Sequence, residues 1–368
     1  MQPHEQLHVH RHRAGLCRTT RRLREGRLTI GFLGGSITDP RPGYTWPEPV
    51  IAWFASRFPE ARITVENAAI GATGSDLAVF RAERDIIERG CDLVFVEYAV
   101  NDGGEATEKR NRTREGLIRK LLAGDGRDLV LPYTFAQPQQ EDMLAGRVPA
   151  TIAEFEILAE HYRIGSVWMG LHALRQVLSG ELRWEAWLPD GLHPQHRGSL
   201  SYAESVIAFL EHELAASPAS PPIPAGATLP APLNPRNWEK ACRLPLTALR
   251  TEGPWALHRW PNYTWIDQVL ATSAPGAKLA FDFDGRGLAL AFDFGKTSAE
   301  FRYRFDGGPW KTETRERFDW VGDEGWFRIS NLADDLPPGP HRVEIEVIHG
   351  GEKCKGTHFR LALVGIIR

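Results

Sequence analysis

A serine follows two glycines at the end of a strand-like apolar segment. Residues 28–33 (LTIGFL) form this segment, and Gly34 and Gly35 lead from it into Ser36. Because glycine tolerates conformations closed to other residues, the pair permits a tight turn that exposes the Ser36 hydroxyl and leaves backbone N–H groups facing a substrate. On this segment alone, a serine that only caps the following helix explains the pattern equally well. The sequence GGSIT lacks the second glycine of the G-x-S-x-G elbow, so an ordinary α/β-hydrolase is disfavoured.

An aspartate and a histidine three residues apart supply what such a serine needs. The segment DGLHP carries Asp190 and His193 on one glycine-containing turn. A serine hydroxyl is a weak nucleophile, so it needs a base, and the base needs an acceptor that fixes its tautomer. An Asx-type turn with an exposed histidine also fits this segment. A metal site is a weaker alternative, because Pro194 interrupts the H-x-x-H pair of His193 and His196 and no further ligand accompanies it.

Two further residues follow neighbouring strand-like segments. Gly71 comes after residues 62–65, and Asn101 ends the apolar run at residues 91–100. Because ligands of open α/β sheets bind at the carboxyl ends of the strands, both residues should lie at the same sheet edge as Ser36. A backbone N–H and a side-chain amide there are the donors that an oxyanion hole requires. Each residue alone is most often an ordinary loop residue, but the four segments in this order favour a shared site.

Together these segments resemble the SGNH (GDSL-type) hydrolases over roughly residues 28–214. That family carries a serine, a glycine, an asparagine and a histidine in four sequence blocks, with an aspartate three residues before the histidine. The matching residues here are Ser36, Gly71, Asn101, His193 and Asp190. The resemblance implies a flavodoxin-like three-layer α/β fold with a parallel sheet. It also implies an oxyanion hole made by the N–H groups of Ser36 and Gly71 and by the side-chain amide of Asn101.

The sequence departs from the family pattern at two positions. The first block reads GGSI in place of GDSL, a variation common in the carbohydrate-active branch, and Ala99 stands where the family usually has glycine. The layout of the chain also resembles two-domain acetylesterases that deacetylate manno-oligosaccharides taken into the cell. Those proteins pair an SGNH domain with a C-terminal jelly-roll module related to carbohydrate-binding modules.

The hydrophobic pattern of residues 28–214 predicts the elements that position these residues. Short runs of apolar residues are typical of strands buried on both faces of a parallel sheet, and longer amphipathic stretches are typical of helices. Their alternation indicates βαβ units and an α/β fold. We expect strands at residues 28–33, 62–65, 91–100 and 128–133, and helices at residues 47–58, 76–89, 113–122, 151–163, 166–178 and 198–214.

A second domain of another class is expected after the first. The chain has 368 residues, and single cores usually divide beyond about 250–300 residues. Residues 215–236 are rich in proline and alanine without periodicity, which predicts a semi-rigid linker. Residues 237–368 change to a period of two, as in LAFDF, which predicts an all-β sandwich; the resemblance adds a jelly-roll-like topology. Residues 1–27 are expected to form an N-terminal arm.

Four aromatic residues near the catalytic segments are candidates for stacking on a sugar ring. Aromatic side chains at such positions are at least as often core or pocket wall, so both interpretations stay open. The candidates are Tyr44, Trp46, Tyr133 and Trp187.

Composition narrows the classes of partner. A net charge of −3 gives no electrostatic reason to expect nucleic acid or an anionic membrane. The sequence has no apolar run of about 20 residues, so no membrane span is predicted. The first residues also lack the apolar core of a secretory signal, and together these two observations lead us to expect a cytoplasmic location. Widely spaced cysteines are typical of unpaired thiols; they are Cys17, Cys91, Cys242 and Cys354.

These observations predict a carbohydrate O-acetylesterase that works through an acyl-enzyme on Ser36 and needs no metal or organic cofactor. Its substrate would be an acetylated oligosaccharide or another small ester. Two rivals stay open: an acyltransferase that uses the same triad with an alcohol in place of water, and a carbohydrate-binding protein whose SGNH domain is silent. The sequence identifies neither the sugar nor the acetylated hydroxyl, and it is compatible with a homo-oligomer.

Overall fold

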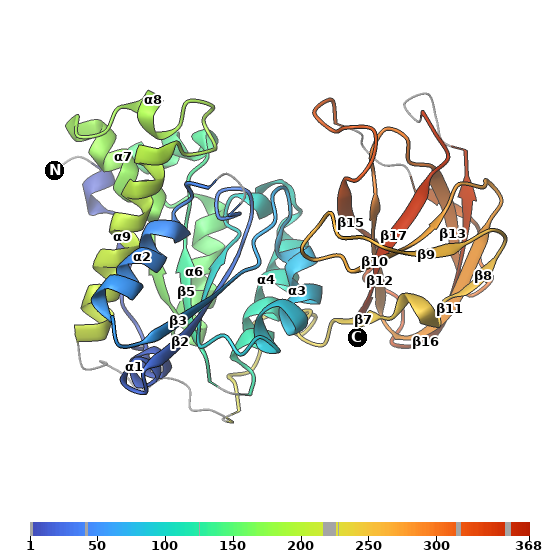
Figure 1. The fold of residues 1–368 in the computed structure, drawn as a ribbon, viewed down its shortest axis with the longest axis horizontal. Coiled ribbons are helices and arrows are strands. Elements are labelled where there is room, and N and C mark those ends of the chain that lie inside the picture. Colours follow the sequence, from blue (N-terminus) through green and yellow to red (C-terminus); the bar gives the residue numbers. More distant parts are fainter. Residues whose placement is uncertain are drawn as a thin grey trace. The chain divides into compact units, whose positions relative to one another are not determined.

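The computed structural model describes residues 3–40, 43–124, 126–215, 226, 228–313, 318–349 and 355–368. The chain divides into two compact units, Met1–Glu239 and Lys240–Arg368, each with its own sheets (Figure 1).

The first unit is built on a six-stranded sheet with the strand order β1-β6-β5-β4-β2-β3. Strands β2 to β6 run parallel, and β1 pairs antiparallel with β6 at the edge. β4 and β5 are buried at every position, as their apolar runs predict, because helices cover both faces of the sheet. The strands are β1 (His10–Arg11), β2 (Arg27–Gly34), β3 (Arg62–Asn67), β4 (Leu93–Glu97), β5 (Asp128–Pro132) and β6 (Gly165–Val167).

Helices lie on both sides of this sheet (Figure 1). On one side α9 packs against α2, α7 and α8, and on the other side α4 packs against α3 and α6. The α/β class predicted for this part of the chain is therefore confirmed. The helices are α1 (Cys17–Arg24), α2 (Pro47–Arg57), α3 (Ser75–Ala82, continued by a π-helical turn over Glu83–Ile87), α4 (Thr107–Leu122), α5 (Gln140–Leu144), α6 (Ala150–Tyr162), α7 (Met169–Ser179), α8 (Trp184–Trp187) and α9 (His196–Ala215).

One predicted helix begins with a strand. The sequence predicts a helix over residues 166–178, but residues 165–167 form β6 and α7 begins only at Met169. Three residues are too few for a period of two to show beside a helical period, so this strand is defined by its pairing with β5 and β1.

The expected N-terminal arm is part of the first unit. Besides β1, it contains α1, whose first turn is tied to the start of β5. The carboxylate of Asp128 accepts hydrogen bonds from the N–H and the hydroxyl of Thr19, each at 2.7 Å. The guanidinium of Arg18 pairs with Asp92 at 2.8 Å beside this contact. These polar contacts hold the segment against the sheet of the first unit.

The later part of the predicted linker and the first three residues of the predicted second domain, 237–239, also belong to the first unit. Trp238 is fully buried, and its N–H donates to the carbonyl of Arg112 in α4. Its backbone lies so close to Gly116 that a Cβ at that glycine would lie 2.5 Å from it. The carboxylate of Glu115 accepts the N–H groups of Leu233 and Asn234. The start of the predicted linker falls in α9, and residues 216–225 and 227 lie outside the described residues.

The second unit consists of two antiparallel sheets, in agreement with the predicted all-β domain. One has the order β15-β12-β17-β10-β9 with β7 paired to β17, and the other has the order β14-β13-β16-β11-β8. The strands are β7 (Cys242–Leu244), β8 (Arg250–Glu252), β9 (Ala256–Arg259), β10 (Gln268–Thr272), β11 (Lys278–Gly285), β12 (Gly287–Asp293), β13 (Glu300–Phe305), β14 (Lys311–Glu313), β15 (Phe327–Ala333), β16 (Gly339–Ile348) and β17 (Phe359–Ile367).

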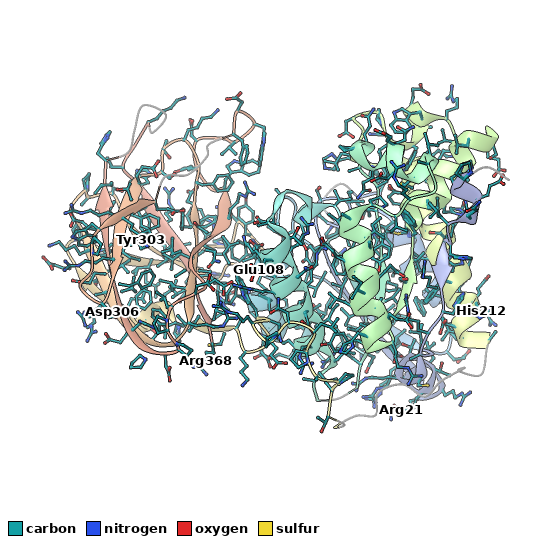
Figure 2. All side chains as sticks on the ribbon, turned by 180° about the vertical axis from the view of Figure 1, so that it is seen from behind. Arg21, Glu108, His212, Tyr303, Asp306 and Arg368 are labelled. Atoms are coloured by element: carbon teal, nitrogen blue, oxygen red, sulfur yellow. The ribbon has the colours of Figure 1, made fainter. Side chains whose placement is uncertain are left out.

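Apolar side chains of both sheets form one core between them. Phe281 of β11 and Leu290 of β12 both belong to it, although these consecutive strands lie in different sheets. The short connection from Gly285 to Gly287 therefore carries the chain from one sheet to the other. Figure 2 shows the packed side chains, with Tyr303 of β13 labelled among them and Asp306 at the turn after that strand.

Candidate active site

Ser36 lies in the turn that follows β2, at the carboxyl edge of the sheet. The N–H groups of Thr38 and Asp39 both donate to the carbonyl of Gly35, which closes the turn. Neither Gly34 nor Gly35 has a positive φ. Both positions require glycine for another reason, which is close approach: a Cβ at Gly35 would overlap the side chain of Asn101, and one at Gly34 would lie 2.8 Å from Thr38.

The structure brings the three predicted triad residues together. Ser36 Oγ lies 2.9 Å from His193 Nε2, and His193 Nδ1 lies 2.8 Å from Asp190 Oδ2. The second oxygen of Asp190 accepts the N–H groups of Leu192 and His193 at 2.9 and 2.7 Å. An ionised carboxylate that accepts at Nδ1 leaves Nε2 free to accept the serine proton.

The charge on Asp190 is stabilised by these hydrogen bonds. Burial raises the pKa of Asp190, but the hydrogen bonds from His193 and from the Leu192 N–H outweigh burial and leave the pKa below its usual value. The side chains of His193 and Asp190 are 47% and 53% exposed. Water can therefore reach the base, as hydrolysis of an acyl-enzyme requires.

The loop that carries Asp190 and His193 is held by residues after β5. Gln137 N–H donates to the carbonyl of Gly191 at 2.9 Å. Gly191 has a φ of +77° and lies against the Gln137 side chain, so both its conformation and its surroundings favour glycine. Two residues earlier, Phe135 packs against Trp187 of α8 with ring centroids 4.7 Å apart.

Two donors beside Ser36 are available for an oxyanion. Among the residues that the structure describes, neither the Ser36 N–H nor the Asn101 side-chain amide donates a hydrogen bond. Asn101 begins the short 3-10 turn after β4, and its amide lies against Gly35. A backbone N–H and a fixed amide next to the nucleophile are suited to stabilise a tetrahedral oxyanion.

The third expected donor is engaged elsewhere. The Gly71 N–H donates to the buried carboxylate of Asp39 at 3.0 Å. The expectation that Gly71 offers a free N–H to the oxyanion is therefore not met in this structure. Asp39 follows Ser36 by three residues, so its carboxylate ties the loop after β3 to the nucleophile turn.

Trp46 is a core residue and not a sugar platform. It is fully buried, its ring packs edge-on against Phe32 and Phe95, and its Nε1 donates to the Thr38 hydroxyl at 3.0 Å. No ring face is left for a ligand. Tyr44, which was proposed with it, is 41% exposed and stays a candidate.

Tyr133 and Trp187 are also buried, so the structure contradicts their assignment as sugar-binding residues. The Tyr133 hydroxyl donates to Glu156 at 2.7 Å. Trp187 packs against Phe135 and Trp184 beneath the loop of Asp190. Both residues support the fold around the site.

A buried network holds the Asn101 turn and was missed by the sequence interpretation. The carboxylate of Asp102 accepts the N–H and the hydroxyl of Ser75 at 2.9 Å each, and the Nε of Arg114 at 2.7 Å. Arg114 in turn contacts Glu154. Arg114 lies near the start of the predicted helix, twelve residues after Asp102, and neither residue type gives a periodic signal that would indicate this contact.

Glu97 is the second residue that the sequence interpretation missed. It ends β4 and is fully buried below the nucleophile turn. The single carboxylate in the apolar run LVFVEYAV was the available signal, because an unpaired charge rarely occupies a strand buried on both faces.

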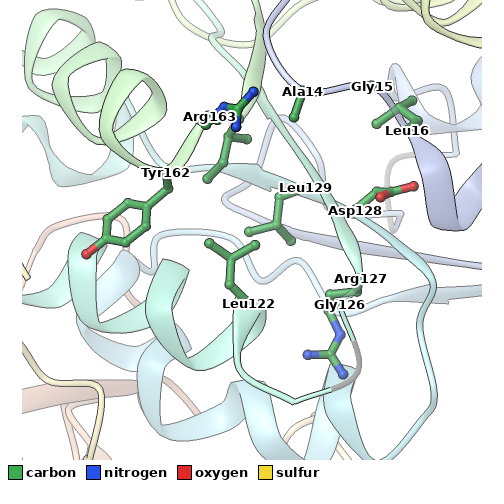
Figure 3. Close-up of a pocket in the computed structure, with 11 residues that line it drawn as sticks. Ala14, Gly15, Leu16, Leu122, Gly126, Arg127, Asp128, Leu129, Tyr162 and Arg163 are labelled. Carbon is green, nitrogen blue, oxygen red and sulfur yellow. The ribbon is translucent and has the colours of Figure 1, made fainter. Parts of the chain in front are cut away.

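The described residues contain no cluster of three or more His, Cys, Asp or Glu side chains arranged to hold a metal ion. A small pocket beside the start of β5 is lined by Asp128 and Leu129 together with Tyr162 of α6 (Figure 3). It adjoins the amino end of β5, whereas Ser36 and Asn101 follow the carboxyl ends of β2 and β4. Of the described helices, none has the length and apolarity to cross a membrane.

No protein-family model and no curated protein sequence matches the chain. Among solved structures, a two-domain esterase active on acetylated mannans, co-crystallised with mannopentaose, matches with a TM-score of 0.81, 23% identity, and coverage of 96% of this chain and 95% of that chain. Another structure of a two-domain esterase active on acetylated mannans matches with a TM-score of 0.79, 24% identity, and coverage of 96% of each chain. An acetylxylan esterase from Geobacillus stearothermophilus matches 52% of this chain and 97% of its own, with 21% identity and a TM-score of 0.41. The protein thus has the two-domain fold of the acetylmannan esterases.

Proposed function

We propose that this protein is a serine esterase of the SGNH type that removes O-acetyl groups from carbohydrates. The observation that carries the proposal is the continuous hydrogen-bonded chain from Ser36 Oγ through His193 to Asp190. An activated serine next to free N–H and amide donors is the arrangement that acyl transfer needs.

The first half of the reaction forms an acetyl-enzyme. Ser36 Oγ attacks the acetyl carbonyl carbon while His193 Nε2 takes the hydroxyl proton. The carbonyl oxygen becomes an oxyanion that the Ser36 N–H and the Asn101 amide stabilise. The tetrahedral intermediate then expels the sugar oxygen, which receives the proton from His193, and the acetyl group remains on Ser36.

The second half returns the serine. His193 removes a proton from a water molecule as its oxygen attacks the acetyl carbon. Collapse of this second intermediate releases acetate and gives the proton from His193 back to Ser36. Asp190 keeps Nδ1 protonated throughout and stabilises the transient imidazolium.

The proposed substrates are acetylated oligosaccharides, with acetylated manno-oligosaccharides first among them. Support comes from the shared two-domain fold with esterases active on acetylated mannans, one of them co-crystallised with mannopentaose. In the proposal the second unit is a jelly-roll-like accessory domain, and no metal or organic cofactor takes part. The cytoplasmic location and the oligomeric state expected from the sequence stay predictions.

The decisive experiment is acetate release from a panel of acetylated oligosaccharides, with NMR identifying the hydroxyl that loses its acetyl group. We expect manno-oligosaccharides to be deacetylated by the wild type and not by Ser36→Ala. If the protein hydrolysed aryl acetates but released acetate from none of the acetylated sugars, the proposed carbohydrate substrate would be rejected.

Two controls separate the rival functions. A fluorophosphonate reagent labels an activated serine, so absence of labelling at Ser36 would favour a silent, sugar-binding protein. Added alcohol acceptors distinguish the acyltransferase: formation of a new ester in place of free acetate would favour transfer over hydrolysis.

A further inference from the structure

The carboxyl group of Glu97 lies directly beneath the turn that carries the nucleophile. Its Oε2 accepts the Thr38 hydroxyl at 3.0 Å, and the carboxyl group also accepts the N–H of Gly35. These two partners lie on either side of Ser36. The Thr38 hydroxyl accepts in turn from the indole of Trp46, so the position of this turn depends on hydrogen bonds that converge below it.

The other oxygen of Glu97 contacts the segment that carries the base. Oε1 accepts the Thr134 hydroxyl at 2.7 Å, just after the end of β5. The next three residues lead to Gln137, whose N–H holds the carbonyl of Gly191. Phe135 of the same segment packs against Trp187, which precedes the Asp190 loop.

We propose that Glu97 is a positioning residue for the esterase reaction: its carboxyl group ties the Ser36 turn to the segment at 134–137 and so sets the separation between Ser36 Oγ and His193 Nε2. The inference rests on the proposed function. Glu97 itself is fully buried and does not touch the reacting atoms. It acts through the two hydroxyl groups and the N–H that it accepts.

The site needs such a connection because its two halves come from distant parts of the chain. Ser36 follows β2, and His193 lies 157 residues later on an exposed loop. No pairing between β2 and β5 exists, because β4 lies between them in the sheet, and Glu97 is the last residue of β4. A misplacement of about 1 Å is enough to lower a catalytic rate about a hundredfold.

The electrostatic cost of burying this carboxyl group indicates that Glu97 does more than fill space in the core. Burial raises the pKa of Glu97 to about 7, against the lowering effect of the hydrogen bonds from Thr134, Thr38 and Gly35. Asp102 adds to this rise, and the buried phenols of Tyr98 and Tyr202 also face the group. A methionine or leucine would fill the same volume without this electrostatic cost.

The test compares variants of Glu97 and Thr134 by fluorophosphonate labelling of Ser36 and by aryl acetate hydrolysis. Glu97→Met keeps the volume and removes every hydrogen bond, so we expect labelling and kcat to fall about 30- to 100-fold while KM stays within about threefold. Thr134→Val removes only the hydrogen bond between Glu97 and the segment that leads to the His193 loop, so we expect labelling and kcat to fall only about tenfold. Glu97→Gln should recover most of the rate, because an amide can accept from Thr38 and donate to the Thr134 oxygen.

A matched control separates positioning from general destabilisation. Glu115 is also buried, and it accepts hydrogen bonds from Leu233, Asn234 and Tyr162 on the side of α4 away from the site. Glu115→Met should lower the thermal midpoint without changing labelling. In addition, Glu97→Met combined with Thr134→Val should cost no more than Glu97→Met alone, because both changes break the same link.

Several results would overturn the inference. One is a folded Glu97→Met protein that is labelled within threefold of the wild-type rate, and another is a Glu97→Gln protein as impaired as Glu97→Met. If Glu97→Met does not fold, Thr134→Val decides, and wild-type labelling of that variant overturns the link. A wild type that is labelled but releases no acetate from sugars refutes the proposed function alone, whereas a wild type that is not labelled refutes both.

Discussion

The Ser36 hydroxyl has a role that no neighbouring group can take over, because it is the hydroxyl that lies against His193 Nε2. We expect Ser36→Ala to fold normally and to lose at least about a thousandfold in kcat for an aryl acetate, the scale seen when a triad member is removed. Circular dichroism and the thermal midpoint check the fold. Activity within tenfold of the wild type would reject Ser36 as the nucleophile.

Asp190 and Asn101 should differ in how much they contribute. Asp190→Asn presents an amide to His193 Nδ1 and favours the wrong tautomer, so kcat should fall by up to about 10⁴. Asn101→Ala removes one oxyanion donor and should cost about 10² to 10³. Steady-state kinetics of both variants decide the order, and a larger loss in Asn101→Ala would require the roles to be reassigned.

Glu97 should also make the free energy of unfolding of the protein depend on pH. The pKa of this carboxyl group is raised from an ordinary value of 4.5 to about 7 in the folded protein. Between those values the folded state holds a proton that the unfolded state has lost, so this group's contribution to stability is full below pH 4.5 and declines as pH rises through about 7. At about 1.4 kcal/mol per pH unit, the decline amounts to about 3 kcal/mol.

Glu97→Gln removes this titration and isolates it from other groups. We expect the free energy of unfolding of Glu97→Gln, relative to the wild type, to rise by about 3 kcal/mol from pH 4.5 to pH 7. Urea unfolding of both proteins across this interval measures the difference. A difference that does not change with pH would show that Glu97 keeps an ordinary pKa in the fold.

At the scale of elements, the site depends on how closely the turn after β2 approaches the turn after β4. A side chain at Gly35 would overlap Asn101, so Gly35→Ala should displace the amide and lower kcat by about a hundredfold. Gly103, in the same turn as Asn101, has open space at its Cβ position and serves as the control. Equal kinetics of Gly35→Ala and Gly103→Ala would disprove the importance of this approach.

At the scale of the molecule, every residue that we assign to the reaction lies in the first unit. A protein ending at residue 239 should therefore hydrolyse small aryl acetates within about threefold of the full chain, because these esters need only the triad and the oxyanion donors. It retains Trp238 against Gly116, and circular dichroism tests whether it folds.

A shorter protein ending at residue 215 is the matched comparison. It exposes the surface of α4 that Trp238 covers, and loss of a buried tryptophan typically costs about 3–5 kcal/mol. Its thermal midpoint should be clearly lower than that of the protein ending at residue 239. If the longer protein were folded and inactive toward aryl acetates, the second unit would have to contribute to the reaction itself.

The chemical residues of this protein were predictable from sequence because their types and positions carry local information. Ser36, Asn101, Asp190 and His193 each follow a strand or occupy a glycine-containing turn, and strand ends of a parallel sheet meet at one edge whatever the details of packing. The alternation of apolar runs and amphipathic stretches likewise predicts the α/β class, because periodicity depends only on which faces are buried.

Which aromatic residues near the site are buried was decided by tertiary packing. Packing depends on the surfaces of other elements, and hydrophobic periodicity does not describe those surfaces. Trp46, Tyr133 and Trp187 have the same composition signal whether they face a ligand or a core, and only neighbours such as Phe32 and Glu156 show that they are buried. Their burial was therefore not predictable from the local pattern.

Hydrogen bonds between residues far apart in the sequence were not predictable for the same reason. The carboxylate of Asp39 that engages the Gly71 N–H lies 32 residues away along the chain, and the Glu97 link joins Thr38 to Thr134. Such contacts form only when separate strands are aligned in one sheet, so the residue types indicate the chemistry, while the distances on which that chemistry depends arise from the packed fold.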